Sequence, residues 1–102
     1  MTSQKDYAVL ITAQEQAELQ PIERESKPFE PDELAGRTVV TLVSVGTELA
    51  SAYKAQSGFP RGVGYAAVFE VEAIGSKIDD IKVGDRVFCM GGHKSYQRAR
   101  RN

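Results

Sequence analysis

Residues 37–45 read Arg-Thr-Val-Val-Thr-Leu-Val-Ser-Val, and this run decides the fold class. Six of its members are β-branched valine or threonine, at 38–41, 43 and 45, and such side chains suit a pleated, packed surface. The run therefore predicts a β-strand. Its apolar side chains fall on both faces, with Val40 and Leu42 on one and Val39, Val43 and Val45 on the other. We expect both faces to be partly covered.

Shorter strands are expected on either side of this run. Residues 7–11 form an apolar stretch, and residues 18–24 suit an edge strand. Residues 67–74 alternate between apolar and charged side chains, as a half-exposed antiparallel strand does. Residues 86–90 follow a tight turn in which Gly84 supplies a positive φ. Together these segments predict a mainly β fold, a partly open antiparallel barrel with one short helix.

That helix is expected over residues 48–56. Leu49, Ala52 and Tyr53 recur there at helical spacing. Thr47 stands immediately before them, where a hydroxyl can cap the helix or relay a proton to a bound substrate. The local pattern favours the cap.

Two further segments are expected to be irregular. Residues 57–64 are rich in Gly and Pro, which predicts a loop where backbone can approach another group closely. Residues 15–33 hold seven acids and three prolines, which favours a solvated loop after the edge strand.

Composition bounds the class of protein. The chain has 102 residues, enough for one domain. Its 13 basic and 14 acidic residues give a net charge of −1, so no bulk attraction to nucleic acid or to an anionic membrane is expected. The only cysteine, Cys89, cannot form an internal disulfide, and a reducing, cytoplasmic location is predicted.

Few residues outside the motifs suggest chemistry. Cys89 and His93 lie four apart, but two ligands do not make a metal site. Cys89 is interpreted as an apolar filler in a strand, and His93 as a surface or turn histidine, because no partner for it is evident in the sequence. Four basic residues gather near the end and are interpreted as a solvated segment rather than a phosphate site: Lys94, Arg98, Arg100 and Arg101.

Four motifs then occur in one order. They are Ser-Val-Gly-Thr-Glu-Leu at 44–49, Pro-Arg-Gly-Val-Gly-Tyr at 60–65, Val-Phe-Glu-Val-Glu-Ala-Ile-Gly at 68–75 and Ile-Lys-Val-Gly-Asp-Arg-Val at 81–87. In combination they resemble the N-terminal, GroES-like catalytic domain of the medium-chain dehydrogenase/reductase superfamily, which includes zinc alcohol dehydrogenases and quinone oxidoreductases. The resemblance implies that residues 1–102 are the substrate-side domain of a longer protein. A Rossmann domain absent from this chain would bind NAD(P).

The departures from the family pattern concern zinc. Val45 and Tyr65 stand where the zinc enzymes have a ligating cysteine and histidine, and no four-cysteine loop follows Val87. The chain thus resembles the zinc-independent branch, and no zinc is expected. The resemblance implies a small-molecule substrate, hydride transfer to or from a carbonyl, quinone or activated alkene, and a possible homodimer of the longer protein.

The resemblance also assigns roles to four residues. Thr47 matches the family's hydroxyl that reaches the reacting oxygen, and Gly46 and Thr47 match cofactor-binding positions. Glu48 matches the acidic residue beside the former metal. Tyr65 is either a second hydrogen-bond donor or a filler of the volume left by the zinc cluster. The 102 residues alone are expected to show no turnover, and the alternative hypothesis is a stand-alone GroES-like binding or assembly module.

Overall fold

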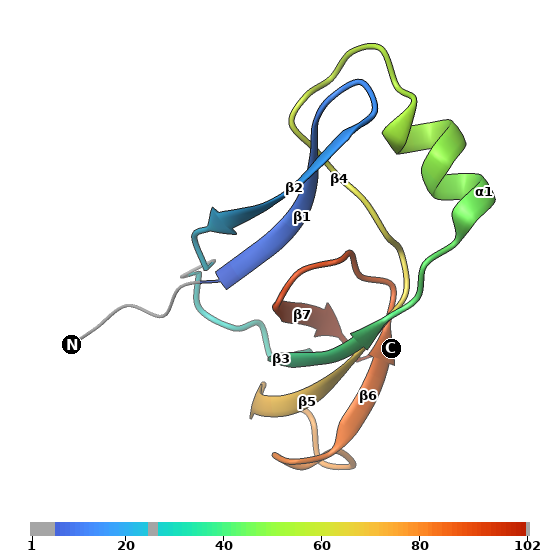
Figure 1. The fold of residues 1–102 in the computed structure, drawn as a ribbon. Coiled ribbons are helices and arrows are strands. Elements are labelled where there is room, and N and C mark those ends of the chain that lie inside the picture. The colour runs from blue at the N-terminus through green and yellow to red at the C-terminus, as the bar shows by residue number, and fades with distance from the viewer. Residues whose placement is uncertain (1–5, 25–26, 102) are drawn as a thin grey trace.

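The computed structural model describes residues 6–24 and 27–101, without the side chains of Val45, Thr47 and Ser51. Over these ranges it has two antiparallel sheets, one of three strands in the order β2-β1-β4 and one of four in the order β6-β5-β3-β7 (Figure 1). The strands are β1 Asp6–Ala13, β2 Gln16–Ile22, β3 Glu33–Thr41, β4 Arg61–Gly62, β5 Ala67–Ile74, β6 Arg86–Cys89 and β7 Tyr96–Arg100. The sheets do not close on each other, so the predicted mainly β, partly open fold is confirmed.

One short helical segment connects the sheets. It begins as α1, Val45–Glu48, and continues as a wider π-helical turn, η1, Leu49–Tyr53. The predicted helix over 48–56 therefore exists but starts three residues earlier. Thr47 lies inside α1 rather than before the helix, so its predicted place at the cap is wrong, and its side chain lies outside the described part.

The hydrophobic core lies on the four-stranded sheet. Phe69 and Val71 of β5 are fully buried, and they pack with Leu34 of β3 and with Ile78 from the loop after β5. Glu70 and Glu72 point to solvent, as the alternation of residues 67–74 predicts. The turn before β6 also follows the prediction, because Gly84 has φ +97° and the Asp85 carboxylate accepts a hydrogen bond from the Lys82 amide.

The central strand differs from its prediction. β3 ends at Thr41, and its buried part is the beginning of the strand rather than the valine-rich end. Val40, Leu42 and Val43 are 58%, 55% and 63% exposed. The expectation that other parts of the protein partly cover both faces of this strand is therefore wrong. The reason lies in the neighbours of β3, since β7 pairs only with its first five residues, Glu33 to Arg37.

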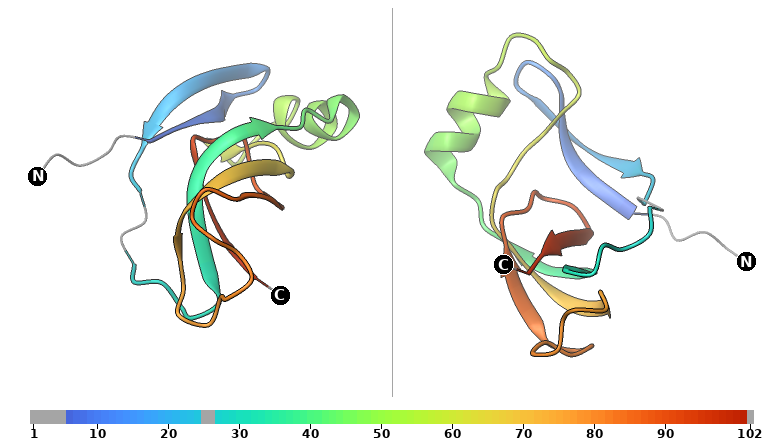
Figure 2. Two further views of the ribbon diagram at one scale, coloured as in Figure 1. Left: turned by 90° about the horizontal axis from the view of Figure 1, so that it is seen from below. Right: turned by 180° about the vertical axis from the view of Figure 1, so that it is seen from behind.

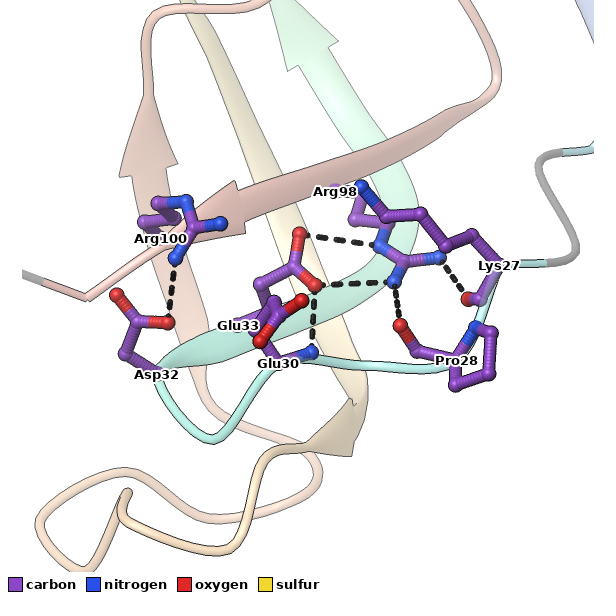
Figure 3. A network of polar contacts seen from close by, with 7 residues as sticks. All are labelled: Lys27, Pro28, Glu30, Asp32, Glu33, Arg98 and Arg100. Atoms are coloured by element: carbon purple, nitrogen blue, oxygen red, sulfur yellow. Dashed lines mark hydrogen bonds and ion pairs between the residues drawn. The ribbon is translucent and has the colours of Figure 1, made fainter.

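The acidic and the basic segments meet each other. β7 was not predicted as a strand, yet Arg98 within it donates to both carboxylate oxygens of Glu33, at 3.0 and 3.3 Å, and to the carbonyl oxygens of Lys27 and Pro28 (Figure 3). Arg100 pairs with Asp32 at 2.7 Å. The interpretation of these segments as solvated is therefore wrong for Arg98 and Glu33, whose side chains are only 9% and 10% exposed, because strand pairing brings them together. It holds for Arg100 and Asp32, which stay largely exposed.

The two sheets are joined by the loop between β6 and β7. The Val9 amide donates to the His93 carbonyl at 2.8 Å, and the Ser95 amide donates to the Tyr7 carbonyl at 2.8 Å. The β1–β2 hairpin and the helix consequently lie on the same side of the four-stranded sheet (Figure 2). The Glu15 amide adds a bond to the Tyr53 carbonyl at 2.7 Å, which fastens the hairpin turn to the end of the helix.

Candidate functional site

A pocket of about 510 Å³ lies where the hairpin, the helix and this joining loop meet. Ligand pockets in proteins commonly have volumes of this order. Most of its wall is apolar, formed by Val9, Ile11, Ala17, Val43, Leu49, Tyr53 and Val63. Three polar side chains complete it, those of Thr41, Glu48 and His93. Leu49 and Tyr53, which recur at helical spacing in the sequence, both line this pocket.

Backbone contacts on both sides hold His93 in place. Its amide donates to the Val63 carbonyl at 2.9 Å, and its carbonyl accepts from the Val9 amide. Gly64 passes directly against the ring, with φ +96°, and a Cβ at that position would lie 2.9 Å from two imidazole atoms. The predicted close backbone approach in the Gly-rich loop is therefore confirmed at Gly64.

Both ring nitrogens of His93 have partners. Nδ1 lies 2.6 Å from Thr41 Oγ1, and Nε2 lies 2.8 Å from Glu48 Oε1. The side chains of His93 and Glu48 are only 11% and 14% exposed. The interpretation of His93 as a surface or turn histidine without a partner is therefore wrong.

Glu48 is fixed by the start of its own helix. Its Oε2 accepts a hydrogen bond from the Ser44 amide at 2.7 Å, as the acid of a capping box does, while its own amide donates to the Ser44 carbonyl at 2.8 Å in an ordinary helical hydrogen bond. Burial raises the pKa of this carboxyl, but hydrogen bonds from Ser44 and His93 outweigh it, and the net pKa is lowered. Glu48 is thus a carboxylate at neutral pH.

The charge on Glu48 decides the tautomer of the neutral imidazole. A carboxylate only accepts hydrogen bonds, so the proton of neutral His93 belongs on Nε2. Nδ1 is then an acceptor, and the Thr41 hydroxyl donates to it. The three side chains form one chain of hydrogen bonds that ends at Thr41, on the pocket wall.

The residues expected from the sequence are distributed unevenly around this pocket. Glu48 lies in its wall, whereas Tyr65 lies outside it with 41% of its surface exposed. Gly46 is exposed, and a Cβ there would have no neighbour within 4 Å. The side chain of Thr47 is outside the described residues. Of these residues, the pocket lining includes Glu48 but neither Tyr65 nor Gly46.

Sequence reasoning missed Thr41 and His93. They lie 52 residues apart, and His93 lies 45 residues from Glu48. Thr41 reads as one more β-branched strand residue, and His93 as one residue after a Gly-Gly pair. No local pattern signals contacts at such separations.

Metal and dinucleotide sites were tested against the same residues. Among the described residues, no three His, Cys, Asp or Glu side chains lie close enough to hold a metal ion together. Cys89 lies in strand β6, as expected, but it is half-buried rather than buried, and burial raises the pKa of its thiol. The turn from β3 into α1 lacks the glycine pattern that holds a pyrophosphate, so these residues do not fit a complete NAD(P) site.

Comparison with known proteins adds no family. No protein-family model matches the chain, and no curated protein matches it. Within the described ranges, no helix has the length and apolar character needed to cross a bilayer. Arguments about function therefore rest on the pocket and its polar wall.

Proposed function

We propose that the chain binds a small, mainly apolar molecule with one polar group, as the substrate-side part of a zinc-independent NAD(P)-dependent oxidoreductase. The substrate class is a carbonyl compound, a quinone or an activated alkene. The observation that carries the proposal is an apolar pocket with a single polar side, formed by Thr41, Glu48 and His93. The oxidoreductase class is supported by the order of the four sequence motifs alone.

The lining of the pocket supports this substrate class. Val9, Ile11 and Val63 offer an apolar surface whose burial favours a hydrophobic ring or chain. A strongly charged ligand would lose its hydration there, and the Glu48 carboxylate is the one charged group of the lining. A ligand with one oxygen atom can bury its apolar part and still form a hydrogen bond at the polar side.

The remaining assignments of this proposal follow the sequence. Thr47 is a hydrogen-bond donor to the reacting oxygen, and Gly46 adjoins the cofactor supplied by another domain. Tyr65 is either a second donor or a filler of the volume left by the zinc cluster. A cytoplasmic location, the absence of zinc and a homodimer of the longer protein also belong to the proposal. The chain itself binds the substrate and does not turn it over.

Binding is tested on the isotopically labelled chain by two-dimensional NMR. 1-Phenylethanol, the alcohol that reduction of acetophenone produces, is titrated against ethylbenzene, which has nearly the same shape but no hydroxyl group. We expect both compounds to shift the amide signals of Val9, Leu49 and Val63, and 1-phenylethanol to bind more tightly. Signals that move only outside the pocket would contradict the proposal.

A blocking variant sharpens this experiment. Leu49→Arg places a long charged side chain at the pocket, and it should abolish both titrations. Leu19→Arg is the matched control, because Leu19 is exposed and lies outside the pocket. With NAD(P)H and acetophenone added together we expect no oxidation of the nucleotide, and oxidation by this chain alone would contradict the division between two domains.

One observation favours a second candidate, the stand-alone binding or assembly module. Val40, Val68 and Phe88 are paired in register across β3, β5 and β6, and Val40 and Phe88 are largely exposed. Such a row suits contact with another protein surface. Native mass spectrometry distinguishes the candidates, because an assembly module should form a ring or another defined oligomer, whereas the substrate-side domain should not.

A further inference from the structure

We infer that Thr41, His93 and Glu48 form a proton relay, in which Thr41 Oγ1 contacts an ionisable hydroxyl of the ligand. The corresponding ligands are phenols, hydroquinones and the alcohols that carbonyl reduction produces. The inference rests on the proposed function, because it needs a ligand in this pocket. To the proposed function it adds the atom that contacts the ligand, the path of the proton, and roles for Thr41 and His93, to which the sequence motifs assign none.

The direction of the relay follows from its fixed end. Glu48 is held by the Ser44 amide and is ionised, so it keeps the Nε2 proton of neutral His93. Nδ1 therefore faces Thr41 as a base. At 2.6 Å, the contact between Nδ1 and Thr41 Oγ1 is a close hydrogen bond.

Thr41 is the member of the relay that a ligand can reach. Both nitrogens of His93 are occupied, and Glu48 already accepts from Ser44 and His93. The Thr41 hydroxyl gives its one proton to Nδ1, but its oxygen keeps two lone pairs, and Thr41 lines the pocket. A ligand hydroxyl therefore donates to Thr41 Oγ1.

The proton transfer balances without any other reactant. The ligand O–H bond breaks and its proton goes to Thr41 Oγ1, while the Thr41 hydroxyl proton goes to His93 Nδ1. The products are a ligand oxyanion, which accepts a hydrogen bond from Thr41, and an imidazolium between Thr41 and the Glu48 carboxylate. The reverse transfer protonates an oxyanion in the pocket.

The charges around the relay favour this transfer. Glu48 lies 2.8 Å from Nε2 and stabilises the imidazolium. The other titratable side chain in the pocket wall is that of Tyr53, and Lys94 follows His93 beside the neighbouring surface hollow. Thr41 is the contact residue, and His93 and Glu48 are positioning residues that act through it.

The relay is tested with 4-nitrophenol, whose absorbance reports its ionisation, and with 4-nitroanisole, the matched ether without a proton to give. We expect the wild-type chain to lower the apparent pKa of bound 4-nitrophenol. Thr41→Val should abolish that shift and weaken phenol binding about tenfold, the value of one hydrogen bond, with little change for the ether. Thr41→Ser restores the hydroxyl and should restore both effects.

The outcomes separate the relay from the pocket. If neither compound binds at the pocket, the proposed function fails. If both compounds bind but Thr41→Val leaves the ionisation of the bound phenol unchanged, the proposed relay is wrong, while the proposed binding of a ligand in the pocket is supported.

A second measurement needs no variant and no ligand. The ¹⁵N shifts of the neutral His93 ring in the wild-type chain should place the proton on Nε2 and show Nδ1 without one. A proton on Nδ1 would overturn the relay.

Discussion

At the residue scale, the surroundings of His93 decide what its ring can do. An imidazole is commonly the group that meets a substrate, but here both nitrogens are occupied by Thr41 and Glu48. Gly64 lies so close to the ring that any side chain there would displace it. The ring is therefore held in one orientation, and the Thr41 hydroxyl is the polar group that it presents to the pocket.

Leu34 allows the core to be tested at the same scale. It is 1% exposed and packs against Phe69 and Val71. Leu34→Ala should lower the free energy of unfolding by about 2–5 kcal/mol, because it removes buried methyl groups and leaves a cavity. Urea denaturation measures this change. Leu19→Ala is the control and should have little effect, since Leu19 is 68% exposed; equal losses in both variants would contradict the assignment of the core.

At the element scale, β7 forms one edge of the four-stranded sheet, and its Arg98 holds the segment that precedes β3. Arg98 uses its guanidinium to join Glu33 to two backbone carbonyls, and it also lies 4.4 Å from the centre of the Phe29 ring. At the other sheet, the Arg24 guanidinium donates two hydrogen bonds to the Asp6 carboxylate, at 2.8 and 2.9 Å. Planar guanidinium groups suit such multiple contacts.

The contact between Arg98 and Glu33 predicts a dependence of stability on pH. Hydrogen bonds from Arg98 and from the Glu30 amide lower the pKa of Glu33 from 4.5 to about 2. A carboxyl whose folded pKa lies below its unfolded pKa stabilises the fold above the unfolded value. Its contribution should be complete above pH 4.5 and should disappear as the pH falls through about 2.

Glu33→Gln isolates this contribution from that of other carboxyls. The variant should be less stable than the wild type at neutral pH, and the difference should shrink as the pH falls from 4.5 toward 2. Thermal unfolding across that range measures it. Asp32→Asn is the control, because the Arg100–Asp32 pair is exposed to solvent and should contribute little to stability. A constant difference between wild type and Glu33→Gln would be inconsistent with this account.

At the scale of the whole molecule, the site exists because separate parts of the fold converge. The hairpin supplies Val9 and Ile11, the end of β3 supplies Thr41, the helix supplies Glu48, and the joining loop supplies His93. The exposed valines after the middle of β3 follow from the same arrangement, because β7 does not continue beside them.

The content of metal is a prediction about the whole molecule. Val45 and Tyr65 replace the ligands that the zinc enzymes of the resembled family use, so the purified protein should contain no stoichiometric zinc. Elemental analysis after dialysis without chelator measures this. One equivalent of zinc per chain would show that Cys89, His93 or Tyr65 had been misjudged.

The amino-acid sequence alone determined the local structure of this protein. Alternation gave the buried face of β5, the glycine at 84 gave its turn, and β-branched and apolar runs gave the other strands except β4 and β7, because these signals act between near neighbours. Only the tertiary structure decided which end of β3 is buried, which acids meet the arginines of β7, and that His93 joins Thr41 to Glu48. The physical reason is separation along the chain: strand pairing brings these groups together, and no local pattern records it.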